Sequence, residues 1–232
     1  PSGVADATDD PIGPEAIAEA LASDLGRKPF ESWLADVAST AAEARDAAKN
    51  VAKWSKRKHR LLEFSQLPGR GWVEYEPYGV VLVIGAWNFP FALTLGPAVG
   101  ALAAGNAVVL KPSEVAPASS ALMAELVPRY LDPDAVAVIE GDGAVSQELI
   151  AQGFDKLCFT GGTEIGKKIM AAAAEHLTPV TLELGGKSPN IFFEDIAQEK
   201  DGFYDKALEG FAFFGLNQGE VCTCPSRALV QK

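Results

Sequence analysis

No charged residue interrupts the chain between Gly79 and Leu110. On length alone such a run could cross a bilayer. Turn-forming residues divide it into shorter pieces, however: Gly85, Asn88, Pro90, Pro97, Gly105 and Asn106. Strands of a parallel sheet are covered on both faces, so they read as continuous apolar runs. The run therefore predicts a strand, a turn, a helix and a second strand inside an α/β sheet, with no membrane span.

The rest of the central region alternates in the same way. Strands are predicted at 72–76, 78–84, 107–110, 135–139 and 156–159 and through Glu183, and helices at 91–104, 118–130, 145–152 and 163–175. Repeated units of strand and helix with short turns containing Gly and Pro are typical of an α/β fold. We therefore expect a doubly wound, mostly parallel, Rossmann-like sheet.

Changes in composition divide the chain into four expected parts. Residues 1–13 are acidic and contain glycine, which predicts a mobile N-terminus. Residues 14–66 form an expected helical arm, because apolar residues recur at spacings of three and four among many alanines. The helices of the arm are predicted at 14–25 and 30–58. Residues 67–184 hold the predicted sheet, and residues 185–232 begin a second α/β region with a strand at 190–193 and an acidic helix at 201–217.

Charge and hydrophobicity narrow the classes of protein. The chain has 31 acidic and 20 basic residues, a net charge of -11, and 48% hydrophobic residues, which favours a globular protein over a disordered one. One basic cluster, Lys53 to Arg60, could contact nucleic acid or an anionic membrane. The favoured interpretation is the solvated end of a helix, where positive charge complements the helix dipole. We therefore expect no nucleic-acid partner.

Cysteine and histidine usage predicts neither a disulfide framework nor a metal site. There are three cysteines, and Cys222 and Cys224, two positions apart, are poorly placed to bridge each other. The two histidines, His59 and His176, lie far apart in the sequence. A reducing, cytoplasmic setting is expected.

A turn rich in glycine follows the strand that ends at Phe159. It runs from Thr160 through Gly161 and Gly162 into a helix that contains Gly166. Glycines let a backbone approach a pyrophosphate, and free N–H groups at the start of a helix favour an anion. The alternative is an ordinary turn between strand and helix, with Thr163 as the N-cap.

Lys111 and Glu114 come directly after the strand ending at Leu110. Open α/β sheets bind their ligands beyond the carboxyl ends of the strands. A carboxylate can accept hydrogen bonds from both ribose hydroxyls and would repel a 2′-phosphate, so Glu114 favours NAD over NADP. The alternative for Lys111 is a solvated charge at the end of a strand.

Three further side chains could carry out covalent chemistry on a carbonyl group. Cys222 is a candidate nucleophile, Glu183 a candidate general base and Asn88 a candidate donor to an oxyanion. Each has a structural alternative. Cys222 could be a buried thiol, Glu183 could project from the open face of a strand, and Asn88 could form a turn before Pro90.

Taken together, five stretches resemble the N-terminal part of aldehyde dehydrogenases, from about Pro14 to Lys232. They are Trp87-Asn88-Phe89-Pro90, Lys111-Pro112-Ser113-Glu114, Phe159-Thr160-Gly161-Gly162-Thr163-Glu164-Ile165-Gly166, Leu182-Glu183-Leu184-Gly185-Gly186-Lys187 and Asn217-Gln218-Gly219-Glu220-Val221-Cys222. The resemblance implies NAD(P)-dependent oxidation of an aldehyde to a carboxylic acid through a thiohemiacetal and a thioester on Cys222. It implies NAD as cofactor, with NADP left open, and a homo-oligomer for the full-length parent.

The resemblance also assigns roles to individual residues. Cys222 becomes the nucleophile, Glu183 the base that activates water, and Asn88 a donor to the oxyanion. The cofactor-binding residues implied are Trp87, Lys111, Pro112, Ser113, Glu114, Thr160, Gly161, Gly162, Thr163, Glu164, Ile165, Gly166 and Leu184. Residues 67–184 become an NAD-binding domain, and 185–232 the beginning of a truncated catalytic domain. We expect little turnover from the chain alone.

Some features depart from the family pattern. Gly162 stands where many relatives have serine or asparagine, the interval from Glu183 to Cys222 is long, and no lysine lies between Phe91 and Leu110. The chain resembles class 3 enzymes upstream of about Pro189 and bacterial short-chain enzymes downstream. The identity of the aldehyde therefore stays open. An acylating relative and a nucleotide-binding module without turnover are the alternatives to the hydrolytic enzyme.

Overall fold

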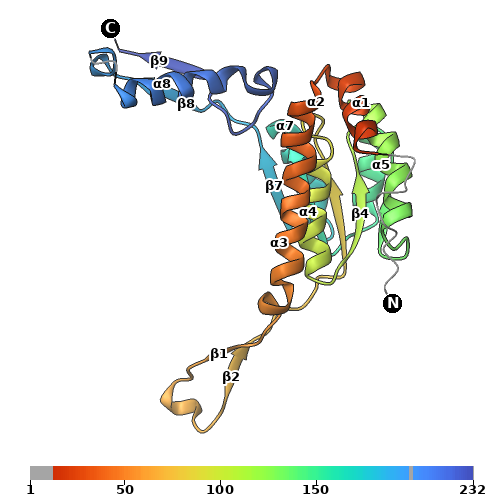
Figure 1. Cartoon of the computed structure of the whole chain (residues 1–232). Helices are drawn as coiled ribbons and strands as arrows, with labels where there is room; N and C mark the ends of the chain where they lie inside the picture. Colours follow the sequence, from red (N-terminus) through yellow and green to blue (C-terminus); the bar gives the residue numbers. More distant parts are fainter. Residues whose placement is uncertain (1–12, 199–200, 232) are drawn as a thin grey trace.

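A five-stranded parallel sheet forms the centre of the computed structural model, which describes residues 13–198 and 201–231 (Figure 1). The strands lie in the order β5-β4-β3-β6-β7. They are β3 (Val80–Ile84), β4 (Ala107–Lys111), β5 (Val136–Val138), β6 (Lys156–Gly161) and β7 (Val180–Leu184). The predicted α/β class with a doubly wound parallel sheet is confirmed.

Strand β3 is buried on both faces, which explains the long run without charge. Val81 and Val83 belong to one core cluster, whereas Leu82 and Ile84 belong to the other. The first cluster is completed by helices α4 and α5, and the second by α6 and α7. These helices are α4 (Ala92–Ala103), α5 (Pro117–Tyr130), α6 (Gly143–Ala151) and α7 (Thr163–Ala174).

The direction of winding reverses beside β3. From β3 the chain moves outward through β4 to β5, and it then returns to place β6 and β7 on the other side of β3. The carboxyl ends of β3 and β6 therefore border a crevice at a topological switch point, the usual ligand site of an open α/β sheet.

The N-terminal helices add an outer layer on one side of the sheet. They are α1 (Pro14–Leu25), α2 (Pro29–Ser32), a π-helical turn (Trp33–Ala38) and α3 (Ser39–Trp54). Helix α1 packs on α5, and α3 lies along α4 (Figure 1). The mobile N-terminus predicted for residues 1–13 lies outside the described residues except for Gly13, the N-cap of α1.

The prediction of a helical arm is wrong beyond Trp54. The basic cluster begins in the last turn of α3 with Lys53, as predicted for a helix end, but Lys58–Arg60 form β1 and pair antiparallel with β2 (Gly71–Val73). A 3-10 turn (Phe64–Gln66) lies between the two strands, and the hairpin projects from the body (Figure 1). Local spacing misled the prediction because pairing with a strand further along the chain decides the conformation here.

Beyond β7 the chain leaves the sheet (Figure 1). This C-terminal segment, residues 189–231, contains β8 (Pro189–Phe192), a 3-10 turn (Glu194–Ala197), α8 (Gly202–Ala212), a second 3-10 segment (Phe213–Gly219) and β9 (Arg227–Val230). Strands β8 and β9 pair in parallel. The helix predicted at 201–217 ends five residues early, and β9 was not predicted.

Within the described ranges, no helix is both long enough and apolar enough to cross a membrane. Among the same residues, no group of three or more His, Cys, Asp or Glu side chains is placed to hold a metal ion.

Candidate active site

A cleft of about 1210 Å³ opens at the switch point of the sheet. Its walls come from the loop after β3, the end of β4, the turn between β6 and α7, the end of β7 and the segment before β9. Cys222, Glu183 and Asn88, far apart in the sequence, all line it. So do nine of the residues predicted to bind a cofactor: Trp87, Lys111, Ser113, Glu114, Thr160, Gly161, Gly162, Ile165 and Leu184.

Lys111 and Glu114 form an ion pair in the wall of the cleft. Lys111 ends β4 and is only 2% exposed, and its Nζ lies 2.8 Å from Oε2 of Glu114. A buried lysine needs such a partner. Partial burial alone would raise the pKa of Glu114, but the hydrogen bond and the charge of Lys111 hold that pKa below its ordinary value. Glu114 therefore presents an ionised carboxylate at the cleft.

The turn between β6 and α7 presents unused backbone donors. Gly162 is the N-cap of α7, and no side chain caps the helix there, so the alternative with Thr163 as N-cap is wrong. The first N–H groups of α7 are thus left for another acceptor. Gly162 has an ordinary φ of -73°, and a Cβ placed on it would meet no atom within 4 Å. A side chain could therefore be accommodated at this position.

Four predicted cofactor residues do not line the cleft: Pro112, Thr163, Glu164 and Gly166. Gly166 has a packing role, since a Cβ there would lie 2.7 Å from Cδ2 of Leu184. Its lack of a side chain lets α7 lie close to β7. Glu164 is exposed and pairs with Lys167 at 2.9 Å on the helix surface.

Cys222 is a free, exposed thiol, and Glu183 is an exposed carboxylate on β7, where it pairs with Thr160 of β6. The thiol is therefore not enclosed in packing, and the carboxylate opens onto the same cleft. Cys158 differs, because it lies half-buried on β6 against the core. Burial raises the pKa of the Cys158 thiol and keeps it protonated.

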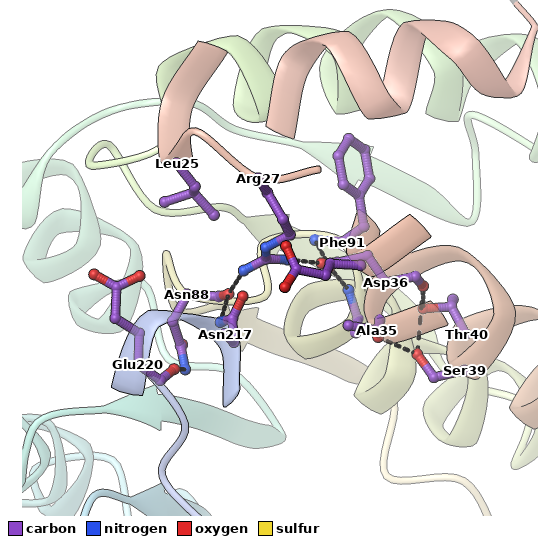
Figure 2. Close-up of polar contacts among 12 residues, drawn as sticks. Leu25, Arg27, Ala35, Asp36, Ser39, Thr40, Asn88, Phe91, Asn217 and Glu220 are labelled. Atoms are coloured by element: carbon purple, nitrogen blue, oxygen red, sulfur yellow. Dashed lines mark hydrogen bonds and ion pairs between the residues drawn. The ribbon is translucent and has the colours of Figure 1, made fainter. Parts of the chain in front are cut away.

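Asn88 connects the loop after β3 with the segment that carries Cys222 (Figure 2). Its side-chain Nδ2 donates to the carbonyl oxygen of Glu220 at 2.8 Å. Its backbone carbonyl accepts from Nδ2 of Asn217 at 3.4 Å and from Nη2 of Arg27. The amide nitrogen carries two hydrogens, and the bond to Glu220 uses one of them.

The backbone before Cys222 is left-handed at three consecutive residues. The φ angles are 48° at Asn217, 60° at Gln218 and 82° at Gly219. Only glycine adopts this conformation without cost, so the first two positions store strain. The chain then turns again, with the Cys224 N–H donating to the Val221 carbonyl at 3.2 Å. These two turns present Cys222 to the cleft.

Sequence reasoning missed Arg27 and Asp36. Oδ2 of Asp36 lies 2.5 Å from Nη1 of Arg27, and both side chains are fully buried. Oδ1 of Asp36 accepts the N–H groups of Phe91 and Ala92, at the start of α4. Burial raises the pKa of Asp36 against the opposing effects of the Ala92 N–H and the Arg27 charge. The only indication of their role in the sequence was that Asp36 stands among the apolar positions of a predicted helix.

This fold and cleft define an α/β protein whose switch-point crevice is joined to a segment that carries a cysteine. Among protein families, the model of the aldehyde dehydrogenase family matches residues 14–232. The chain belongs to that family.

Three similar proteins illustrate the relationship. Aldehyde dehydrogenase family 3 member H1 of Arabidopsis thaliana is 44% identical over 219 residues, which cover 94% of this chain and 44% of the relative. The dimeric NADP-preferring aldehyde dehydrogenase of Rattus norvegicus is 43% identical, with coverages of 93% and 46%. PnpE from Pseudomonas sp. WBC-3, in its crystal structure with nicotinamide adenine dinucleotide, superposes with a TM-score of 0.80 at 34% identity, covering 94% and 44%. The chain thus spans less than half the length of each.

Proposed function

We propose that the chain forms the cofactor-binding part and the cysteine-bearing part of a longer, NAD(P)-dependent aldehyde dehydrogenase that hydrolyses its acyl intermediate. The observation that carries this proposal is the shared cleft, which brings Cys222, Glu183 and Asn88 to the crevice formed by β3 and β6. Family membership supports aldehyde oxidation in general.

The proposed reaction begins with addition of the Cys222 thiolate to the aldehyde carbon. The resulting oxyanion accepts hydrogen bonds from the Asn88 amide and from the backbone N–H of Cys222. A nicotinamide held in the cleft would supply the oxidation, as the hydride acceptor that converts this adduct to a thioester on Cys222. Glu183 then takes a proton from water as that water attacks the thioester, releasing the carboxylic acid and the thiol.

The residues present fit a dinucleotide. The uncapped N-terminus of α7 suits the pyrophosphate, and the Glu114 carboxylate, held by buried Lys111, suits the ribose hydroxyls. Glu114 favours NAD because a carboxylate repels a 2′-phosphate. NADP stays open, since one relative is named for preferring it and another is solved with NAD.

We also propose that the full-length protein is a homo-oligomer in a reducing compartment such as the cytoplasm. The projecting hairpin exposes Leu61, Phe64 and Trp72, which a partner subunit would cover. The rat relative is named as dimeric. All three cysteines are free, as the chemistry of Cys222 requires.

The deciding experiment measures aldehyde-dependent NADH formation by the full-length protein, using a panel of short, long and aromatic aldehydes. Cys222→Ala should lower the rate more than about a thousandfold while NAD still binds. Cys158→Ala, which removes a thiol outside the cleft, is the matched control. NAD binding without any turnover would support a binding module instead. A requirement for an added acyl acceptor such as a thiol would support an acylating enzyme.

A further inference from the structure

A buried arginine between the first two helices reaches the proposed catalytic loop. Arg27 is 2% exposed and lies in the connection from α1 to α2, sixty-one positions before Asn88. Nη1 binds Asp36 and Nη2 donates to the Asn88 carbonyl (Figure 2). The guanidinium carbon also lies 4.9 Å from the centre of the Phe89 ring. One rigid group thus fixes both the loop after β3 and, through Asp36, the start of α4.

The end of α1, beside this connection, holds the left-handed turn before Cys222. Nε2 of Gln218 donates to the carbonyl of Leu25, the last residue of α1, at 2.8 Å. The carbonyl of Asn88 accepts from Arg27 and from Asn217, and the Asn88 side chain donates to Glu220. The turn at 217–219 is therefore tied to the N-terminal helices at two points, one direct and one through Asn88.

These ties address a physical problem of the site. Two non-glycine residues in the left-handed region would relax to ordinary backbone angles unless neighbouring groups prevented it. The C-terminal segment supplies little packing of its own, since Asn217 is the one buried side chain among those described in residues 189–231. Polar ties from outside the segment therefore determine where Cys222 lies relative to Asn88.

We propose that the end of α1 and its connection to α2 form a positioning element for catalysis, in which Arg27 and the Leu25 carbonyl hold the Asn88 loop and the turn at 217–219 in register. Arg27 is then a positioning residue, acting on the oxyanion site through the Asn88 backbone. This inference rests on the proposed function for its kinetic consequence, whereas its mechanical consequence can be measured without turnover.

Two variants of the full-length protein test the proposal. Arg27→Lys keeps the positive charge opposite Asp36 but loses the planar fork that reaches Asp36 and Asn88 together. Gln218→Glu keeps the shape of an exposed side chain but places a carboxylate against the Leu25 carbonyl. The matched control is Thr178→Val, which removes the 2.8 Å hydrogen bond to the Phe154 carbonyl away from the cleft.

The mechanical test is amide hydrogen exchange. The Glu220 amide closes the turn before Cys222 by donating to the Asn217 carbonyl, and the Cys224 amide closes the turn that contains Cys222 by donating to the Val221 carbonyl. Both test variants should increase exchange at these two amides, whereas amides of α5 should exchange as before. Thr178→Val should leave Glu220 and Cys224 unchanged. The proposal would be overturned if both test variants exchanged these two amides at the rate of the unsubstituted protein. It would also be overturned if Thr178→Val increased their exchange as much as the test variants do.

The kinetic test separates positioning from general stability. Arg27→Lys should lower kcat about tenfold or more with less than about a twofold change in the KM for NAD, because misplacement of the oxyanion donor affects the transition state. The same loss in Thr178→Val would contradict this. Should Arg27→Lys not fold, Gln218→Glu decides by both measurements. If the unsubstituted protein lacks turnover that depends on Cys222, the proposed function fails, and hydrogen exchange alone then decides the positioning role.

Discussion

The central sheet and the C-terminal segment, residues 189–231, differ in how far their side chains are buried. Strand β3 contributes Leu82, which is fully buried, to a core that helices cover on both faces. Strand β9 is exposed at every residue, and α8 buries none of its side chains. Large apolar residues such as Phe203 and Leu229 face solvent in this segment. The residues assigned to the cofactor therefore rest on a closed core, whereas the proposed nucleophile rests on strained backbone and a few polar ties.

This difference separates two kinds of function. A rigid sheet edge suits the recognition of a fixed cofactor, because its side chains hold their geometry without the ligand. The exposed apolar side chains of the C-terminal segment indicate a surface that further protein covers. That conclusion agrees with the proposal that the chain acts within a longer protein.

The largest expected effect tests the division of chemistry between the two regions. Glu183 lies at the end of β7, in the sheet, and Cys222 lies in the C-terminal segment. Glu183→Gln in the full-length protein should lower steady turnover by about 10²- to 10⁴-fold, because water is no longer deprotonated. A rapid burst of NADH should survive, since Cys222 still forms the thioester. Stopped-flow absorbance measures both phases, and unaltered steady turnover would remove Glu183 from its role.

A pair of leucine substitutions tests the difference in packing. In the 232-residue chain, Leu82→Ala should lower the free energy of unfolding by about 2–5 kcal/mol because it opens a cavity in the core. Leu229→Ala, at a half-exposed position on β9, should cost less than about 1 kcal/mol. Urea denaturation followed by circular dichroism gives both values. Equal losses at the two sites would mean that the C-terminal segment is also well covered.

Cofactor selection should depend on the sheet region alone. Glu114→Gln should weaken NAD binding about tenfold and reduce discrimination against NADP, because the repulsive charge is lost. Glu125→Gln on α5 is the control, since it removes a similar carboxylate paired with Arg129 on the helix surface. Titration with each cofactor by calorimetry measures the effect. No change in the ratio of the two affinities would remove Glu114 from cofactor selection.

The smallest expected effect is the pH dependence of the Lys111 and Glu114 pair. Because the folded pKa of Glu114 is lowered, the pair stabilises the fold above the ordinary value of 4.5, and this contribution is lost as pH falls through the folded pKa. Glu114 is about half exposed, so the contribution should stay below about 1 kcal/mol. The difference in unfolding free energy between the unsubstituted protein and Glu114→Gln should therefore be constant from about pH 7 to pH 5 and shrink below that range. A difference that grew on acidification would contradict the direction of the shift.

Much of the central sheet could be predicted because its signals are local. The uncharged run that begins at Gly79 reads as β3, α4 and β4 because each element fills the interior, and turn residues mark the boundaries. Strands β1 and β9 were missed for the opposite reason, whereas β2 overlaps the strand predicted at 72–76. Lys58 forms a strand only because Val73 pairs with it, and Arg227 only because Pro189 does. A short, exposed strand of this kind shows no alternation of apolar and polar residues from which it could be predicted.

Site residues could be predicted where the residue type itself indicates a chemical role. They could not be predicted where the role depends on contacts that only the folded structure shows. Cys222, Glu183 and Lys111 carry reactive or charged groups at the ends of recognisable elements, and all three line the cleft. Arg27 and Asp36 could not be found, because their importance comes from burial against each other across two helices. Gly166, predicted to bind the cofactor, does not line the cleft, and a Cβ there would lie 2.7 Å from Cδ2 of Leu184.

The left-handed turn at 217–219 bears on attempts to redesign the protein. Asparagine tolerates left-handed backbone angles better than most residues. Valine, isoleucine or threonine at 217 or 218 would disrupt the turn, so that any effect of these side chains on substrate choice could not be observed. A randomised library at those two codons would therefore return mostly unfolded or inactive clones. Substitutions meant to change ligand binding are better made at Gly162. The cleft wall has room for a side chain there, and the backbone angles are ordinary.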